Sequence, residues 1–107
     1  IEAYLTHIFL HFKKNQDHVT SLLFSKNDYF LRQLQKELEH HVYPMVAEDL
    51  RVSYPNIPSS FLKHFVVTNF IETLTWWLKN GKSYKEDQVV RFYLEVMEMT
   101  YTTPLDI

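Results

Sequence analysis

The sequence contains no cysteine, which excludes disulfide bonds, thiol catalysis and cysteine-ligated zinc. A chain without cysteine suits a reducing compartment, so we expect a cytoplasmic protein. No apolar run reaches the length of about 18 residues that a membrane-spanning helix needs, and no basic segment followed by an apolar stretch suggests a signal peptide. The chain opens on Ile1, and we expect a further N-terminal part ahead of it.

Glycine and proline are also rare, with one glycine and four prolines among 107 residues. Few tight turns are therefore possible, and the chain is expected to form a small number of long elements. A hydrophobic content of 46% supplies enough apolar side chains for the core of a single domain spanning residues 1–107. These features predict an all-α fold.

Positive charge is neither abundant nor clustered, because lysine and arginine are scattered and the formal net charge is -2. Binding to a nucleic-acid backbone depends on clustered positive charge. This chain alone is therefore not expected to bind DNA.

Helical periodicity divides the chain into five predicted helices, which together form a bundle. Polar residues from Ser25 to Asp28 can cap the third helix, and Pro44 interrupts its apolar pattern. The segment 51–58 contains two prolines and is expected to be the longest connection. The predicted helices are about 1–15, 16–24, 28–52 with a kink at Pro44, 58–80 and 84–101.

The fourth predicted helix is apolar around far more of its circumference than one core requires. At about 100° per residue its apolar side chains cover an arc of roughly 240°, whereas a surface helix needs little more than about 100°. The last helix shows the same excess. Asn80 with Gly81 predicts a tight end for the fourth helix, and Ser83 with Glu86 predicts a capping box for the last. Because the connection is short, we expect these two helices to be antiparallel neighbours.

The apolar excess predicts that a second copy covers the remaining surface and completes a dimeric four-helix bundle. The alternative is that the earlier helices, or residues ahead of Ile1, cover both faces. The residues predicted for the dimer interface are Phe70, Leu74, Trp77, Leu78, Val89, Phe92, Tyr93 and Val96.

The stretch from Ile57 to Met99, with its WWLKNG turn at residues 76–81 and its final helix, resembles the end of the C-terminal domain of TetR-family bacterial transcriptional regulators. The type it resembles occurs in low-GC Gram-positive bacteria. The resemblance implies a homodimer through the last two helices, and an apolar pocket for a small-molecule effector among the earlier ones. The effector would reset the spacing of two N-terminal DNA-binding heads. Those heads are absent from this chain, so contact with DNA is expected only through them.

Asn69 and Thr73 are polar groups inside the apolar arc, so they should be buried and need hydrogen-bond partners, which a ligand could provide. Alternatively, Thr73 bonds back to its own helix and Asn69 pairs across the bundle. Met45 is expected to use the space that the kink at Pro44 opens. The residues predicted to line the ligand pocket are Tyr4, His11, Phe30, Leu34, His41, Met45, Phe65, Asn69, Thr73 and Trp76.

Other functions find less support in the sequence. His7 and His11 have a spacing that can hold zinc, but no third ligand accompanies them, and we interpret them as boundary histidines. No motif places a nucleophile beside a base, so no enzyme, metal site or cofactor is predicted. The remaining alternative is a helical protein-interaction module that has no small-molecule ligand.

Overall fold

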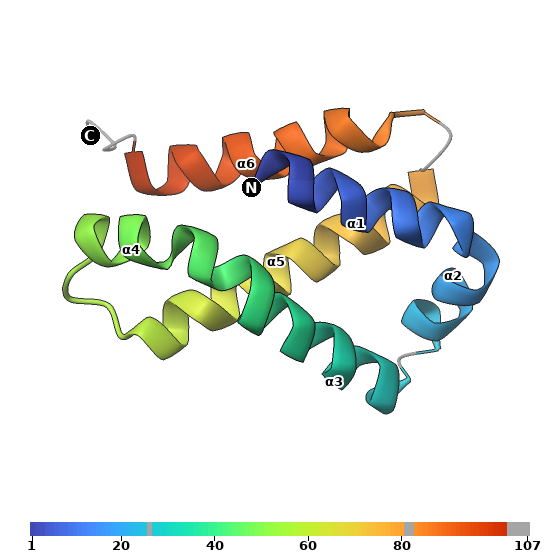
Figure 1. The fold of residues 1–107 in the computed structure, drawn as a ribbon, viewed down its shortest axis with the longest axis horizontal. Helices are drawn as coiled ribbons and strands as arrows, with labels where there is room; N and C mark the ends of the chain where they lie inside the picture. Colours follow the sequence, from blue (N-terminus) through green and yellow to red (C-terminus); the bar gives the residue numbers. More distant parts are fainter. Residues whose placement is uncertain (26, 81–82, 103–107) are drawn as a thin grey trace.

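The fold is built from helices (Figure 1). The computed structural model describes residues 1–25, 27–80 and 83–102, and these ranges contain no strand. The helices are α1 (Glu2–Lys14), α2 (Gln16–Phe24), α3 (Asp28–Glu37), α4 (Tyr43–Ser53), α5 (Ser59–Asn80) and α6 (Glu86–Thr102), and a π-helical turn (Leu38–Val42) joins α3 to α4. The predicted all-α fold is confirmed, and each predicted helix end lies within two residues of the observed one.

The helices α3 and α4 follow one another without a loop, and the distortion between them lies directly before Pro44. A proline inside a helix lacks the N–H that would bond four residues back, and its ring collides with the carbonyl group there. The preceding turn is wider instead, so that the N–H of Tyr43 bonds to the carbonyl oxygen of Leu38, five residues earlier. The predicted kink is therefore confirmed. Asn27 caps the start of α3, because its side chain accepts a hydrogen bond from the N–H of Phe30 at 2.9 Å.

The long helix α5 runs through the middle of the fold, where α2, α4, α6 and the π-helical turn contact it (Figure 1). Phe9 of α1 is fully buried against it. The ring of Phe9 lies 5.5 Å from that of Phe70 and 5.1 Å from that of Trp77, measured between ring centroids. Aromatic pairs at such distances contribute about 0.5–1.5 kcal/mol beyond the burial of their surface. The centre of the core is thus an aromatic cluster shared by α1 and α5.

The start of α6 lies two residues later than predicted, because a different side chain caps it. The side-chain oxygen of Gln88 accepts a hydrogen bond from the N–H of Lys85 at 2.9 Å. The predicted capping box of Ser83 and Glu86 is therefore wrong, since Gln88 has the role that was expected of Glu86. Gly81, which was predicted to end the preceding helix, lies outside the described residues.

The helix α6 packs more extensively on α1 than on α5, and two ion pairs join α6 to α1. Lys13 Nζ in the last turn of α1 lies 2.6 Å from Glu86 Oε1 in the first turn of α6, an arrangement that also suits both helix dipoles. Arg91 Nε donates to Glu2 Oε1 at 3.1 Å. The ammonium group of Lys13 is the main reason that the pKa of the Glu86 carboxyl is lowered from its ordinary value.

The Glu86→Gln variant is expected to be less stable than the wild-type chain at neutral pH by no more than about 1 kcal/mol, because Lys13 is half exposed and solvent screens the pair. A carboxyl whose pKa is lowered on folding stabilises the fold above its ordinary pKa of 4.5, and this contribution is lost as the pH falls through the lowered value. Urea unfolding at a series of acidic pH values should therefore show a smaller loss of stability in the variant.

The matched control is Glu95→Gln, which changes an exposed carboxylate of the same helix. The control should keep the acid dependence of the wild-type chain. If Glu86→Gln also keeps it, the ion pair contributes nothing to stability.

Candidate functional site

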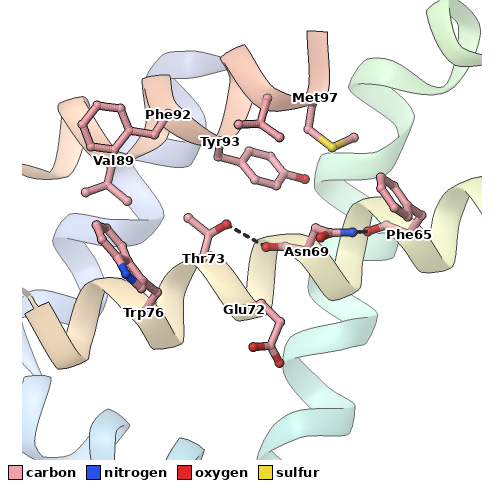
Figure 2. A pocket seen from close by; sticks show the side chains of 10 residues that line it. Phe65, Asn69, Glu72, Thr73, Trp76, Val89, Phe92, Tyr93 and Met97 are labelled. Atoms are coloured by element: carbon pink, nitrogen blue, oxygen red, sulfur yellow. Dashed lines mark hydrogen bonds between the residues drawn. The ribbon is translucent and has the colours of Figure 1, made fainter. Parts of the chain in front are cut away.

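A groove of about 520 Å³ lies between α5 and α6 (Figure 2). It exists because α6 packs chiefly on α1 and leaves part of α5 uncovered. Both helices contribute to its lining, in which apolar side chains predominate. The lining residues are Phe65, Asn69, Glu72, Thr73, Trp76, Val89, Phe92, Tyr93, Val96 and Met97.

Three aromatic rings follow one another beside this groove. Trp76 stacks on Tyr84 with ring centroids 5.6 Å apart, and Tyr84 meets Phe92 edge to face at 5.4 Å. All three side chains are exposed, although each ring packs on the next. Exposed apolar surface that is contiguous in this way often marks an interaction site.

The two adjacent tryptophans divide between the core and the groove. Trp77 is buried, packs against Phe9 and donates its ring N–H to the carbonyl oxygen of Tyr84 at 3.3 Å. Trp76 lies one residue earlier, about 100° away around the helix, and lines the groove. Trp77 therefore holds Tyr84, just ahead of α6, to the core. Trp76 instead belongs to the exposed surface of the groove.

Asn69 and Thr73 are half-buried and lie one helical turn apart in the groove lining. Asn69 Nδ2 donates to the carbonyl oxygen of Phe65, and Thr73 Oγ1 donates to the carbonyl oxygen of Asn69, each at 2.7 Å. The local bond of Thr73 agrees with the alternative interpretation of its role. The expected pairing of Asn69 across the bundle is not what the structure shows, because its amide bonds to its own helix.

Tyr93 lies on the α6 side of the groove and connects α6 to α5. Its hydroxyl donates to the carbonyl oxygen of Val66 at 2.8 Å, and its ring meets that of Phe70 edge to face at 5.6 Å. Burial raises the pKa of the Tyr93 hydroxyl far above its ordinary value. The hydroxyl is therefore a neutral donor throughout the physiological range.

A second pocket, of about 330 Å³, lies between α1 and α3. Side chains three and four positions apart on a helix point the same way, so the α1 residues that line this pocket lie on one face of the helix. Apolar side chains are combined here with a phenol, two imidazoles and a carboxylate. The lining residues are Tyr4, His7, Ile8, His11, Phe12, Leu34, Glu37 and Leu38. The carboxylate of Glu37 also lies 3.4 Å from Nε2 of His41.

The ten residues predicted to bind a ligand do not form one site. Those that line the pocket between α1 and α3 are Tyr4, His11 and Leu34, and those that line the groove are Phe65, Asn69, Thr73 and Trp76. Phe30, His41 and Met45 line neither of these two sites. Met45 is 47% exposed, so the distortion before Pro44 leaves it facing solvent instead of a cavity.

The residues predicted for the dimer interface fall into a buried group and an exposed group. Phe70, Leu74, Trp77 and Leu78 are buried in the core of the single chain, and Val89 and Tyr93 are buried in the groove lining. Phe92 and Val96 are exposed, at 42% and 62%. The neighbouring helices therefore cover more of α5 than its apolar arc suggested, and the pairing of two copies stays a prediction.

Sequence reasoning missed several lining residues of both sites. His7 was considered only as a metal ligand, and Ile8 and Glu37 were not considered as pocket residues. The spacing from Tyr4 to His11 could have identified His7 and Ile8 as pocket residues, because all four lie on the same helical face. Glu72 and Met97 of the groove were also missed, and their positions depend on how α6 is placed against α5.

No group of three or more histidine, aspartate or glutamate side chains in residues 1–25, 27–80 and 83–102 is placed to hold a metal ion. No helix in this part of the chain is long and apolar enough to cross a membrane.

Comparison with known proteins identifies the class. Residues 1–99 match the sequence profile of a family described as transcriptional regulator C-terminal region, of the TetR type. The match covers nearly the whole chain, and the chain therefore belongs to this family. The resemblance to TetR C-terminal domains is thus confirmed, without distinguishing the Gram-positive type. No curated protein and no solved structure matches the chain significantly.

The Tyr93→Phe variant is expected to lose about 1 kcal/mol of stability, because the buried hydrogen bond to Val66 is removed while the ring remains. The raised pKa also predicts that the wild-type chain loses stability as the pH rises above the ordinary tyrosine value of 10.0, whereas the variant loses less. Urea unfolding at neutral and alkaline pH measures both effects. Tyr29→Phe, at a residue that is 71% exposed, is the control and should match the wild-type chain.

Proposed function

We propose that the chain is the effector-binding and homodimerisation domain of a TetR-type transcriptional regulator that acts in the cytoplasm of a Gram-positive bacterium. Family membership supports the regulatory role. The observation that carries the proposal is the apolar groove between α5 and α6 together with the exposed side chains beside it. The pocket between α1 and α3 supports the binding of an effector.

The surface beside the groove has the features of a self-associating patch. Val96 and Phe92 lie on the groove side of α6 and expose 62% and 42% of their surface, and Trp76 extends this apolar surface onto α5. Burial of apolar surface contributes about 25 cal/mol for each Å². A two-fold dimer uses the same patch on both copies, so that each copy covers the groove of the other.

The pocket between α1 and α3 suits a small molecule. Its volume of about 330 Å³ lies in the range that ligand sites occupy. The apolar lining from Ile8, Phe12 and Leu34 can hold the body of a ligand, while Tyr4 and the two histidines can orient its polar groups. The effector is therefore proposed to be an amphipathic molecule that makes few polar contacts.

A ligand in this pocket would touch two helices that are connected to different parts of the fold. The helix α3 continues into the π-helical turn, and such turns often accompany functional sites in helices. The helix α1 is joined to α6 by the pairs Lys13 with Glu86 and Glu2 with Arg91. A ligand that favours one spacing of α1 and α3 would shift α1 relative to the dimer bundle. This shift would change the spacing of the DNA-binding heads that the TetR resemblance implies.

The Val96→Glu variant is expected to weaken the dimer at least tenfold, because its unpaired carboxylate would be buried in an apolar interface. Sedimentation velocity over a range of micromolar concentrations measures the dissociation constant. The matched control is Val52→Glu, which changes an equally exposed valine, at 66%, on α4 and outside the groove lining.

Two results would overturn the dimerisation proposal. The first is a wild-type chain that sediments as a monomer at tens of micromolar. The second is a dimer that both valine variants weaken equally, since the interface would then lie elsewhere.

A thermal-shift screen of small amphipathic metabolites should yield compounds that raise the melting temperature, because a ligand stabilises the folded state by mass action. For each such compound, the double variant His7→Ala and His11→Ala should lose most of the shift. The control His18→Ala changes an exposed histidine outside the pocket and should keep the full shift.

The screen also separates the proposal from a helical protein-interaction module. A screen without any stabilising compound would favour that alternative. Compounds that stabilise all three proteins equally would contradict the assignment of the pocket.

A further inference from the structure

The groove between α5 and α6 contains one amide whose hydrogen-bonding capacity is only partly used. A primary amide has two N–H donors and one oxygen that accepts. One N–H of Asn69 bonds to the carbonyl oxygen of Phe65. Within the described residues, the side-chain oxygen of Asn69 accepts no hydrogen bond and its second N–H donates none. One donor and one acceptor of Asn69 therefore remain for a group outside this chain.

The neighbours of Asn69 make this residual capacity significant. Phe65, Tyr93 and Met97 line the same groove with apolar surface. The hydroxyl of Thr73 already donates its only proton to the carbonyl oxygen of Asn69 (Figure 2). Covering the amide with a purely apolar surface would leave its donor and acceptor unsatisfied, at a cost of about 1–3 kcal/mol. Whatever covers the groove must therefore bring both a donor and an acceptor to this point.

A second copy of this chain meets the requirement with the same side chain. A two-fold axis brings identical groups together, and an amide with one free N–H and one free oxygen is its own complement. We propose that the two-fold axis of the homodimer passes close to Asn69, so that the Asn69 amides of the two copies pair across it. This inference rests on the proposed dimerisation and adds the position of the axis and the residue that sets the register.

The rest of the groove gives little control over register. The exposed residues Trp76, Phe92 and Val96 are apolar, and burial of apolar surface does not depend on direction. A slip of one copy along the other by one helical turn would place Phe65 or Thr73 opposite Asn69. The ring of Phe65 pairs with neither amide group, and the hydroxyl of Thr73 has no proton left to donate to the amide oxygen. A single buried asparagine in an apolar helical interface selects one register and one oligomeric state in this way, at some cost in stability.

Cross-linking of single cysteines tests the position of the axis directly, because the chain has no cysteine of its own. A disulfide requires Cα atoms within about 7 Å of each other, so a residue on the axis can form one with its own copy. Asn69→Cys is expected to form a disulfide-linked dimer at least tenfold faster than Glu72→Cys under mild oxidation. Glu72 lies less than one turn away on α5 at the edge of the same groove, and its side chain points away from α6 (Figure 2).

A charge at the same position provides an independent test. Asn69→Asp would place two carboxylates against each other across the axis, and like charges repel strongly at short distance. We expect its dimer dissociation constant at neutral pH to be at least tenfold higher than that of Thr68→Asp, and to recover as the pH falls and the carboxyls are protonated. Thr68 is the preceding residue of α5 and does not line the groove. Sedimentation velocity measures both variants, and circular dichroism checks that each is folded.

The outcomes separate this inference from the proposed dimerisation. A monomeric wild-type chain would overturn both. If the wild-type chain is a dimer, but Asn69→Cys cross-links no faster than Glu72→Cys, the axis lies elsewhere and only the role of Asn69 is wrong. A dimer of Asn69→Asp as tight as that of Thr68→Asp would lead to the same conclusion. Each of the two Asn69 variants decides the question if the other does not fold.

Discussion

The need to cover an unusually apolar central helix governs the arrangement of the whole fold. Most of the buried side chains of α5 are large and apolar, and α2, α4, α6 and the π-helical turn contact them from different directions. Phe9 of α1 adds the aromatic contacts with Phe70 and Trp77. One side of α5 stays incompletely covered because α6 packs mainly on α1. The groove therefore forms because a small domain has too few helices to cover every side of α5.

The helix α1 is the structural link between the two candidate sites. One of its faces lines the pocket through Tyr4 and His11, while another places Phe9 in the core. Its two ends are joined to α6 by ion pairs, at Glu2 and at Lys13. A displacement of α1 at the pocket would therefore reach α6 through direct contacts, without passing through a flexible loop. This geometry gives the proposed regulator a short path between the effector and the surface that pairs.

The sequence predicted the helices and their ends well, because periodicity, the prolines and polar capping residues are local signals. It predicted the division between core and surface poorly. A helical wheel counts apolar residues but does not say which neighbour covers each of them, so Leu74 and Trp77 were predicted to face a partner and are core residues. Likewise, Gln88 and not Glu86 caps the last helix, while Glu86 pairs with Lys13, a residue distant in sequence that no local pattern connects to it.

The wide turn ahead of Pro44 also changes where a regular spacing in the sequence places side chains around the helix. Leu34, Leu38 and Val42 are buried at a constant spacing of four residues. In an α-helix, which turns about 100° per residue, each such step would rotate the side chain by about 40° around the axis. A π-helical turn winds more slowly and reverses this rotation. The wide turn thus brings Val42 back toward the side of the helix that carries Leu34, whereas a regular helix would carry it further around the axis.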